Sequence, residues 1–322
     1  MKSEILMLLP VFGLALASVE SRAQSWPAKP LRVVVPIAAG SLTDTVPRVV
    51  FEPLSERLGQ TIVVDNRPGA GMTLGSGLVA RAAPDGYTLL ATSSAHTIAP
   101  ALYPALDYQP VRDFVAVAPL GASPFVLVVP PAREFKTARD LVAAAKARPG
   151  ALNFASPGVG TASHLSAERF RLSAAIEAEH VPFKGGAEAM AEVIAGRIDF
   201  FFMALGAALP NIRSGKLTAL AVNGATRSGV LPDVPTLKEA GFDDADYPTW
   251  FGLFLPARTP SDIVAGLHRE TMAILREPRV RDRLTAMGVD ALSLSPAEFG
   301  ATVEREMAIN AALVKAIGLR PQ

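Results

Sequence analysis

Residues 31–44 read LRVVVPIAAGSLTD, and this stretch governs how the rest of the chain is interpreted. Residues 31–35 form a short, valine-rich apolar run, which is the composition of a parallel strand buried on both faces. Pro36 has no N–H to donate and ends the strand. The small residues 38–40 and the mostly polar residues 41–44 then lead into an amphipathic segment. The stretch predicts a strand, a loop and a helix start, whose free N–H groups suit an anion.

The alternation of strand and helix continues along the first third of the chain. Further strands are expected at residues 61–65, 87–91 and 115–120, with helical segments between the first of them. Strands that alternate with helices predict a parallel, doubly wound sheet. Residues 100–110 are rich in proline and tyrosine, and we expect an irregular loop there.

A second α/β unit begins at Phe125. Its strand at residues 151–155 leads into SPGVGTASHL (156–165), which repeats the order of strand, glycine loop and hydroxyl-rich helix start. Ligands of open α/β sheets bind beyond the carboxyl ends of the strands, so two such units predict two lobes that face a cleft. The expected boundaries are given by residue ranges: lobe 1 spans 24–124, lobe 2 spans 125–228, and residues 229–322 return to lobe 1.

Composition and length narrow the class of protein. The chain has 322 residues, enough for two cores, and its formal net charge of +1 argues against nucleic acid as a partner. It has no cysteine, so disulfides and thiolate metal sites are excluded. Residues 1–23 read as a secretory signal removed before Gln24, which predicts a periplasmic protein. The alternative is an uncleaved anchor, but the apolar centre at residues 5–17 is shorter than the roughly 20 residues that span a bilayer.

Several enzyme signatures are missing from the sequence. It contains no G-x-S-x-G elbow, no phosphate-binding loop and no H-E-x-x-H motif, and its four histidines lack metal-ligand spacing. No metal and no cofactor are therefore expected. A Ser/His/Asp triad stays open, because its members can be distant in sequence. His164 can donate to an anion or pack on Ser156 or the backbone, and Asp44 can orient a ligand amine or water or cap its helix.

Many blocks of the chain occur in the same order in one family. The sequence resembles the substrate-binding proteins of tripartite tricarboxylate transporters, the Bug-type periplasmic receptors. The blocks include DNRPGAGM (65–72), APDGYTLL (83–90), SPGVGTASHLSAERF (156–170), HVPFKGG (180–186), LPDVPTLKEAG (231–241) and WFGLFLPARTP (250–260). The resemblance implies an α/β, two-lobe periplasmic-binding-protein fold, a type II-like venus flytrap that closes on a small carboxylate.

The resemblance also implies which residues bind. In that family two loops hold the ligand carboxylate through backbone N–H groups, hydroxyls and bridging waters. Together with the residues that follow the strands, the expected ligand-binding set is Ile37, Gly40, Ser41, Leu42, Thr43, Asp44 and Ser93 in lobe 1, and Ser156, Gly158, Gly160, Thr161, Ser163, His164, Met203 and Ala204 in lobe 2.

Three departures from the family pattern affect the expected ligand. Ser41 and Leu42 replace glycines, and Phe183 stands where tyrosine is more usual. Met203 and Ala204 stand where an Asp-Asn pair is usual, so an ammonium group would lack its carboxylate partner. We therefore hypothesise a carboxylate with an apolar remainder, aromatic or aliphatic, rather than an amino acid.

The expected function is a monomeric, non-enzymatic receptor that delivers a carboxylate to membrane permease subunits. Charge-assisted hydrogen bonds from two loops can give micromolar affinity, which requires a binding free energy of about 8 kcal/mol. Two alternatives remain open: an exported α/β hydrolase that uses a serine with His164, and a ligand-sensing subunit that contacts a signalling kinase.

Overall fold

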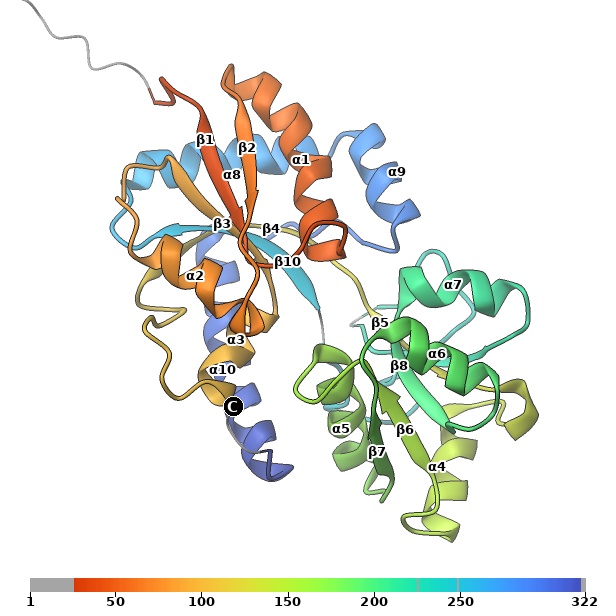
Figure 1. Cartoon of the computed structure of the whole chain (residues 1–322). Helices are drawn as coiled ribbons and strands as arrows, with labels where there is room; N and C mark the ends of the chain where they lie inside the picture. Colours follow the sequence, from red (N-terminus) through yellow and green to blue (C-terminus); the bar gives the residue numbers. More distant parts are fainter. Residues whose placement is uncertain (1–25, 225, 248, 320–322) are drawn as a thin grey trace, which may run out of the picture.

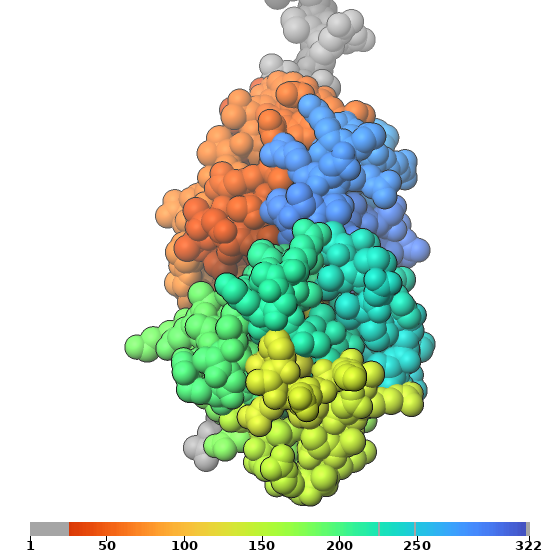
Figure 2. Space-filling model, turned by 90° about the vertical axis from the view of Figure 1, so that its right-hand side faces the viewer, coloured from red at the N-terminus to blue at the C-terminus, as the bar shows by residue number. Residues whose placement is uncertain are grey.

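The chain folds into two lobes in a computed structural model (Figure 1). The structure describes residues 26–224, 226–247 and 249–319, so the expected signal at residues 1–23 lies outside it. Figure 2 shows that the beginning and the end of the chain form one lobe, and that the middle of the chain forms the other. No helix in the described ranges is long and apolar enough to cross a bilayer.

The first lobe is built on a five-stranded sheet with the order β2-β1-β3-β10-β4. Its elements, in chain order, are β1 (Leu31–Val35), α1 (Leu42–Leu58), β2 (Ile62–Asn66), the 3₁₀ turn η1 (Ala70–Met72), α2 (Thr73–Ala80), β3 (Thr88–Ser93), α3 (Ala95–Leu102) and β4 (Phe114–Ala122), and after the second lobe β10 (Trp250–Pro256), α8 (Ser261–Leu275), α9 (Pro278–Ala286) and α10 (Pro296–Ala316).

The second lobe is built on a five-stranded sheet with the order β7-β6-β8-β5-β9. Its elements are β5 (Phe125–Val129), η2 (Pro131–Arg133), α4 (Ala138–Ala147), β6 (Asn153–Ser156), α5 (Ala162–Ala174), β7 (Glu179–Pro182), α6 (Gly186–Ile194), β8 (Phe200–Ala204), α7 (Leu205–Arg213) and β9 (Thr218–Val222).

Helices cover both faces of each sheet, as the apolar strands require. In β1, Val33 and Val35 pack in the core under α1, α8 and α9, whereas Val34 points to the opposite core under α2 and α10. In β5, Leu127 faces the core that includes α4 and α5, and Val126 faces α6 and α7. The expectation that residues 31–35 are buried on both faces is confirmed.

The prediction of fully parallel sheets is wrong at one strand of each sheet. β5 runs antiparallel to β8 and β9, and β10 runs antiparallel to β3 and β4. These are the first strands after each crossing between lobes. A strand that starts at the hinge runs away from the cleft, whereas the other strands of its sheet run toward it.

The second crossing comes later than expected. The sequence places the return to lobe 1 at residue 229, but Leu237, Phe242 and Ala245 pack in the core of the second lobe. The chain rejoins the first sheet only at β10. Asn223 holds both crossings to this lobe, because its Oδ1 accepts from Phe125 N at 2.6 Å and its Nδ2 donates to Tyr247 O at 2.9 Å.

Part of the expected irregular loop at residues 100–110 is helical. α3 runs through Pro100 to Leu102, although proline removes one backbone hydrogen bond. Tertiary contacts compensate: Ile98 and Leu102 pack with Leu313 and Val314 of α10 in one apolar cluster. α3 therefore becomes a fixed wall beside the hinge.

The close contact of β10 with α10 predicts that the first lobe does not tolerate a side chain at Gly252. A Cβ there would lie 2.7 Å from Phe299 Cε1, so Gly252→Ala should destabilise the protein by about 1–3 kcal/mol through overpacking. Urea unfolding measures this. Gly266→Ala is the control, since a Cβ at this position in α8 has open space and should be neutral or stabilising. Equal stability of the two variants would contradict the packing described.

A buried histidine predicts acid sensitivity of the first lobe. His96 of α3 packs among Tyr108, Phe114 and Phe254, and burial lowers its pKa to about 3. Between pH 6.5 and 3 the His96 imidazole binds a proton in the unfolded chain but not in the folded chain. The free energy of unfolding therefore decreases as the pH is lowered, by up to about 1.4 kcal/mol per pH unit. Unfolding at several pH values should show that His96→Phe loses less stability on acidification than the wild type. Parallel pH profiles would exclude this role.

Candidate ligand-binding site

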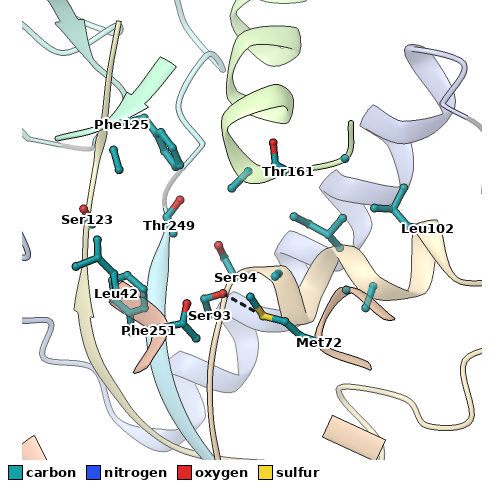
Figure 3. A pocket seen from close by; sticks show the side chains of 18 of the residues that line it. Leu42, Met72, Ser93, Ser94, Leu102, Ser123, Phe125, Thr161, Thr249 and Phe251 are labelled. Atoms are coloured by element: carbon teal, nitrogen blue, oxygen red, sulfur yellow. Dashed lines mark hydrogen bonds between the residues drawn. The ribbon is translucent and has the colours of Figure 1, made fainter. Parts of the chain in front are cut away.

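A cavity of about 380 Å³ lies between the two lobes, beside the hinge. Figure 3 shows the side chains around it, with α3 and the start of α5 on different sides. The residues that line it are Leu42, Thr43, Gly71, Met72, Ser93, Ser94, Ala95, Ile98, Ala99, Leu102, Tyr103, Ser123, Phe125, Val159, Gly160, Thr161, Ala162, Ala204, Thr249 and Phe251.

None of these lining residues carries a formal charge. The polar side chains are hydroxyls, from serine, threonine and one tyrosine, and the remaining lining is apolar or glycine. No group of three or more histidine, aspartate or glutamate side chains within the described ranges is placed to hold a metal ion. The cavity thus offers hydrogen bonds and apolar contact without an ionic partner.

Four helices begin at this cavity. The first residues of α1 (Leu42), α3 (Ala95) and α5 (Ala162) line it, and so does Ala204, the N-cap residue of α7. A helix N-terminus has unpaired N–H groups and a partial positive charge that attract an anion. In α1, α3 and α7 the N-cap side chain makes no capping hydrogen bond. These N-termini can therefore donate to a guest.

Three buried hydroxyls at the hinge have no hydrogen-bond partner among the described residues. They belong to Ser94, Ser123 and Thr249. Backbone bonds bring them together, because Ser123 N donates to Thr249 O at 2.9 Å and Ser94 N donates to Trp250 O at 3.0 Å. We call these three residues the hinge hydroxyls. A buried hydroxyl without a partner is costly, so a ligand or water that accepts from it is stabilised.

The loop before α1 is held in place by Asp44. Its carboxylate accepts from Gly40 N, from Arg48 Nε and from Asn66 Nδ2, each at 2.9 Å. Burial opposes ionisation, but the hydrogen bonds from Asn66, Gly40 and Arg48 outweigh it and hold the pKa of Asp44 below its usual value. Asp44 does not line the cavity, so its role here is to fix the loop in front of its helix.

The glycine loop before α5 is held by His164. His164 Nδ1 accepts from Gly160 N at 3.1 Å, and Thr161 Oγ1 accepts from His164 N at 3.3 Å. Gly160 has a positive φ of 77°, and a Cβ there would lie 3.0 Å from Leu102 Cδ1 across the cleft. The loop can thus approach α3 closely only with glycine at position 160.

A second histidine, His180, packs against His164 and so supports this loop. The rings of His164 and His180 stack with centroids 3.9 Å apart, and His180 Nε2 lies 2.7 Å from Ser156 Oγ. Burial and the neighbouring His164 lower the pKa of His180 to about 4. On the other side, His164 Nε2 lies 3.7 Å from Glu168, which also pairs with Arg171 at 2.8 Å.

The structure divides the expected ligand-binding residues into two groups. Those that line the cavity are Leu42, Thr43, Ser93, Gly160, Thr161 and Ala204. Those that do not line it are Ile37, Gly40, Ser41, Asp44, Ser156, Gly158, Ser163, His164 and Met203. Several of the second group bond to the loops or strands that carry the first. Ser163 Oγ, for example, donates to Phe202 O at 2.6 Å.

Sequence reasoning missed the hinge and the face of α3. Ser123 and Thr249 line the cavity only because the chain crosses twice beside it, and no local motif marks those crossings. Leu102 was hidden by the expectation of an irregular loop at residues 100–110, and no helix was expected around Ile98. Their spacing of four residues is the one signal that could have indicated a helical face.

Comparison with known proteins identifies the family. The family model described as "Tripartite tricarboxylate transporter family receptor" matches residues 46–319. The chain belongs to this receptor family. It is similar to Protein BugT of Bordetella pertussis, with 33% identity over 319 residues, which covers 97% of this chain and 98% of BugT.

Solved structures agree with the two-lobe fold of the receptor. A Rhodopseudomonas palustris protein with adipate is 30% identical and has a TM-score of 0.78, with 92% of this chain and 100% of that one covered. MatC of Rhodopseudomonas palustris with bound malate is 34% identical and has a TM-score of 0.74, with 90% and 100% covered. The α/β periplasmic-binding-protein fold predicted from the sequence is thereby confirmed.

The contact between His164 and Gly160 predicts different effects of two substitutions in the receptor. His164→Ala leaves the Gly160 N–H without its acceptor, which should cost about 1–3 kcal/mol and speed hydrogen exchange in residues 157–161. In His164→Asn a side-chain oxygen can replace Nδ1 and should preserve most of the protection. Unchanged exchange in the alanine variant would show that the loop is held in another way.

Proposed function

We propose that this receptor encloses a small organic carboxylate between its two lobes in the periplasm and delivers it to membrane permease subunits. The lobes that close are proposed to be residues 26–122 with 250–319, and residues 125–247. The bound carboxylate accepts hydrogen bonds from the hinge hydroxyls and from the uncapped N-termini of α1, α3 and α7. Monomeric action and the permease contact are part of this proposal.

One observation carries the proposal: four helix N-termini and three unpartnered hydroxyls converge on a cavity whose lining has no charged side chain. Such a site stabilises an anion through N–H and O–H donors alone. The adipate and malate named for two solved relatives are carboxylates, which is consistent with this chemistry. Residues outside the lining, Asp44 and His164 among them, keep the two loops in position.

The geometry gives little support to the alternative of a hydrolase. Ser156 is fully buried and its hydroxyl already contacts His180 and the Gly158 backbone. His164 Nδ1 is occupied by Gly160 N–H, and His164 lies outside the cavity lining. Neither histidine is placed to activate a serine at the cavity. Ester turnover that His164→Ala abolishes would overturn the receptor proposal in favour of the hydrolase.

A thermal-shift screen of the mature protein tests the proposal directly. The panel contains hexanoate, adipate and malate, with glucose and putrescine as compounds that lack a carboxylate. A ligand present at 100 times its Kd adds about 2.7 kcal/mol to the stability. We expect at least one carboxylate to raise the melting temperature, and neither control compound to do so.

A matched pair of variants then tests the hinge. Thr249→Val keeps the shape of the side chain and removes the hydroxyl, so any bound carboxylate should lose about 1.5–3 kcal/mol, or roughly 10- to 100-fold in Kd. Thr271→Val is the control, because Thr271 also has a buried hydroxyl without a described partner but lies in α8, away from the cavity. Equal affinities in titration calorimetry for the two variants would remove the hinge hydroxyls from the site.

A further inference from the structure

We infer that the ligand is a monocarboxylate with an apolar body, whose carboxylate sits at the hinge hydroxyls while its body lies along α3. This inference rests on the proposed function and adds the ligand class and its orientation. It follows from the way in which polar and apolar groups are distributed along the cavity.

The polar end of the cavity is the hinge. Ser94, Ser123 and Thr249 meet there through their backbone hydrogen bonds, and all three hydroxyls lack a partner among the described residues. Two other hydroxyls of the lining are already engaged, since Thr161 Oγ1 contacts Gly158 O at 2.8 Å and Ser93 Oγ contacts Met72 Sδ at 3.9 Å. A carboxylate of the ligand is therefore stabilised most by hydrogen bonds at the hinge, where the hydroxyl donors have no other partner.

One face of α3 connects this polar end with an apolar one. Ser94, Ala95, Ile98, Ala99 and Leu102 all line the cavity, at the spacing of a single helical face. At 1.5 Å per residue, Leu102 lies about 12 Å along the helix from Ser94. The two alanines leave room beside the helix, and the larger side chains stand toward its end. Figure 3 shows Ser94 and Leu102 separated along α3.

The far end is apolar and uncharged. Ile98, Leu102 and Val159 of the glycine loop all line the cavity, and Leu102 approaches the Gly160 backbone. The polar groups at this end are the Tyr103 hydroxyl and the start of α5, where His164 already occupies the Gly160 N–H. Val159 is 43% exposed and lines the cavity, so its side chain is available to contact an apolar guest at this end.

A second carboxylate on the ligand would meet unfavourable surroundings at this end. It would lie near the C-terminal turn of α3, where the helix dipole is negative, and the N-terminus of α5 at this end is already capped, because Thr161 Oγ1 accepts from His164 N. No lysine, arginine or histidine lines the cavity to neutralise it. An ammonium group would likewise find no carboxylate in the lining. Burial of an unpaired charge is costly, so dicarboxylates and amino acids should bind more weakly than monocarboxylates of equal length.

Titration calorimetry with matched probes tests the ligand class. The pairs are hexanoate against adipate and octanoate against octanedioate, which differ only in the second carboxylate. We expect the monocarboxylate of each pair to bind the wild-type protein at least tenfold more tightly. Tighter binding of the dicarboxylates would overturn the inference and leave the proposed carboxylate receptor intact. If none of the four binds and none of the screened carboxylates raises the melting temperature, the proposed function itself fails.

A charge introduced at the apolar end tests the orientation. Val159→Arg places a guanidinium beside Leu102, and because position 159 is exposed the variant should fold normally. We expect the preference for hexanoate over adipate to shrink at least tenfold or to reverse. Leu172→Arg is the control, because Leu172 is also exposed in the second lobe, at 45%, but does not line the cavity. An equal change in both variants, or no change in either, would contradict the orientation.

Discussion

The arrangement of the molecule depends on two neighbouring crossings of the chain, joined by the hydrogen bond from Ser123 N to Thr249 O. Asn223 fastens both crossings to the second lobe through its side chain. Each lobe has its own main apolar cores, and one smaller cluster joins Ile98, Leu102, Leu313 and Val314 of the first lobe to Leu165 and Tyr247 of the second. Movement of the lobes about this junction therefore leaves the main cores intact but changes the packing of that smaller cluster. Because both crossings leave from the same edge, β5 and β10 are antiparallel in their sheets, and the other strands bring their carboxyl ends to the cleft.

That single topological fact also determines the electrostatics of the site. Helices that follow strands at the cleft edge start there, so their N-termini converge without any charged side chain in the lining. Charged residues lie outside the lining of the cavity, where Asp44 pairs with Arg48 and Glu168 pairs with Arg171. Those pairs hold the loops in position. The site thus separates groups that can bind from groups that position them.

The sequence predicted the parts of this design that have local signatures. The buried strand at residues 31–35 and the glycine loop before α5 could be predicted because composition and spacing encode them. The hinge could not be predicted, since Ser123 and Thr249 are distant in sequence and become neighbours only through the double crossing. The helical face of α3 was missed because its contacts with α10 outweigh the effect of Pro100, and these contacts are tertiary. His164 was expected to bind the ligand, whereas in the structure it does not line the cavity and accepts a hydrogen bond from Gly160 N of the loop.

The neutral lining of the cavity also bears on the empty protein. A receptor that balanced its ligand with a buried arginine would keep an unpaired, desolvated charge after each release, and this costs several kcal/mol. Here the donors are N–H and O–H groups, which water can satisfy almost as well as a carboxylate can. The empty cleft therefore holds no buried charged side chain without a partner. Release of a ligand is not opposed by that penalty.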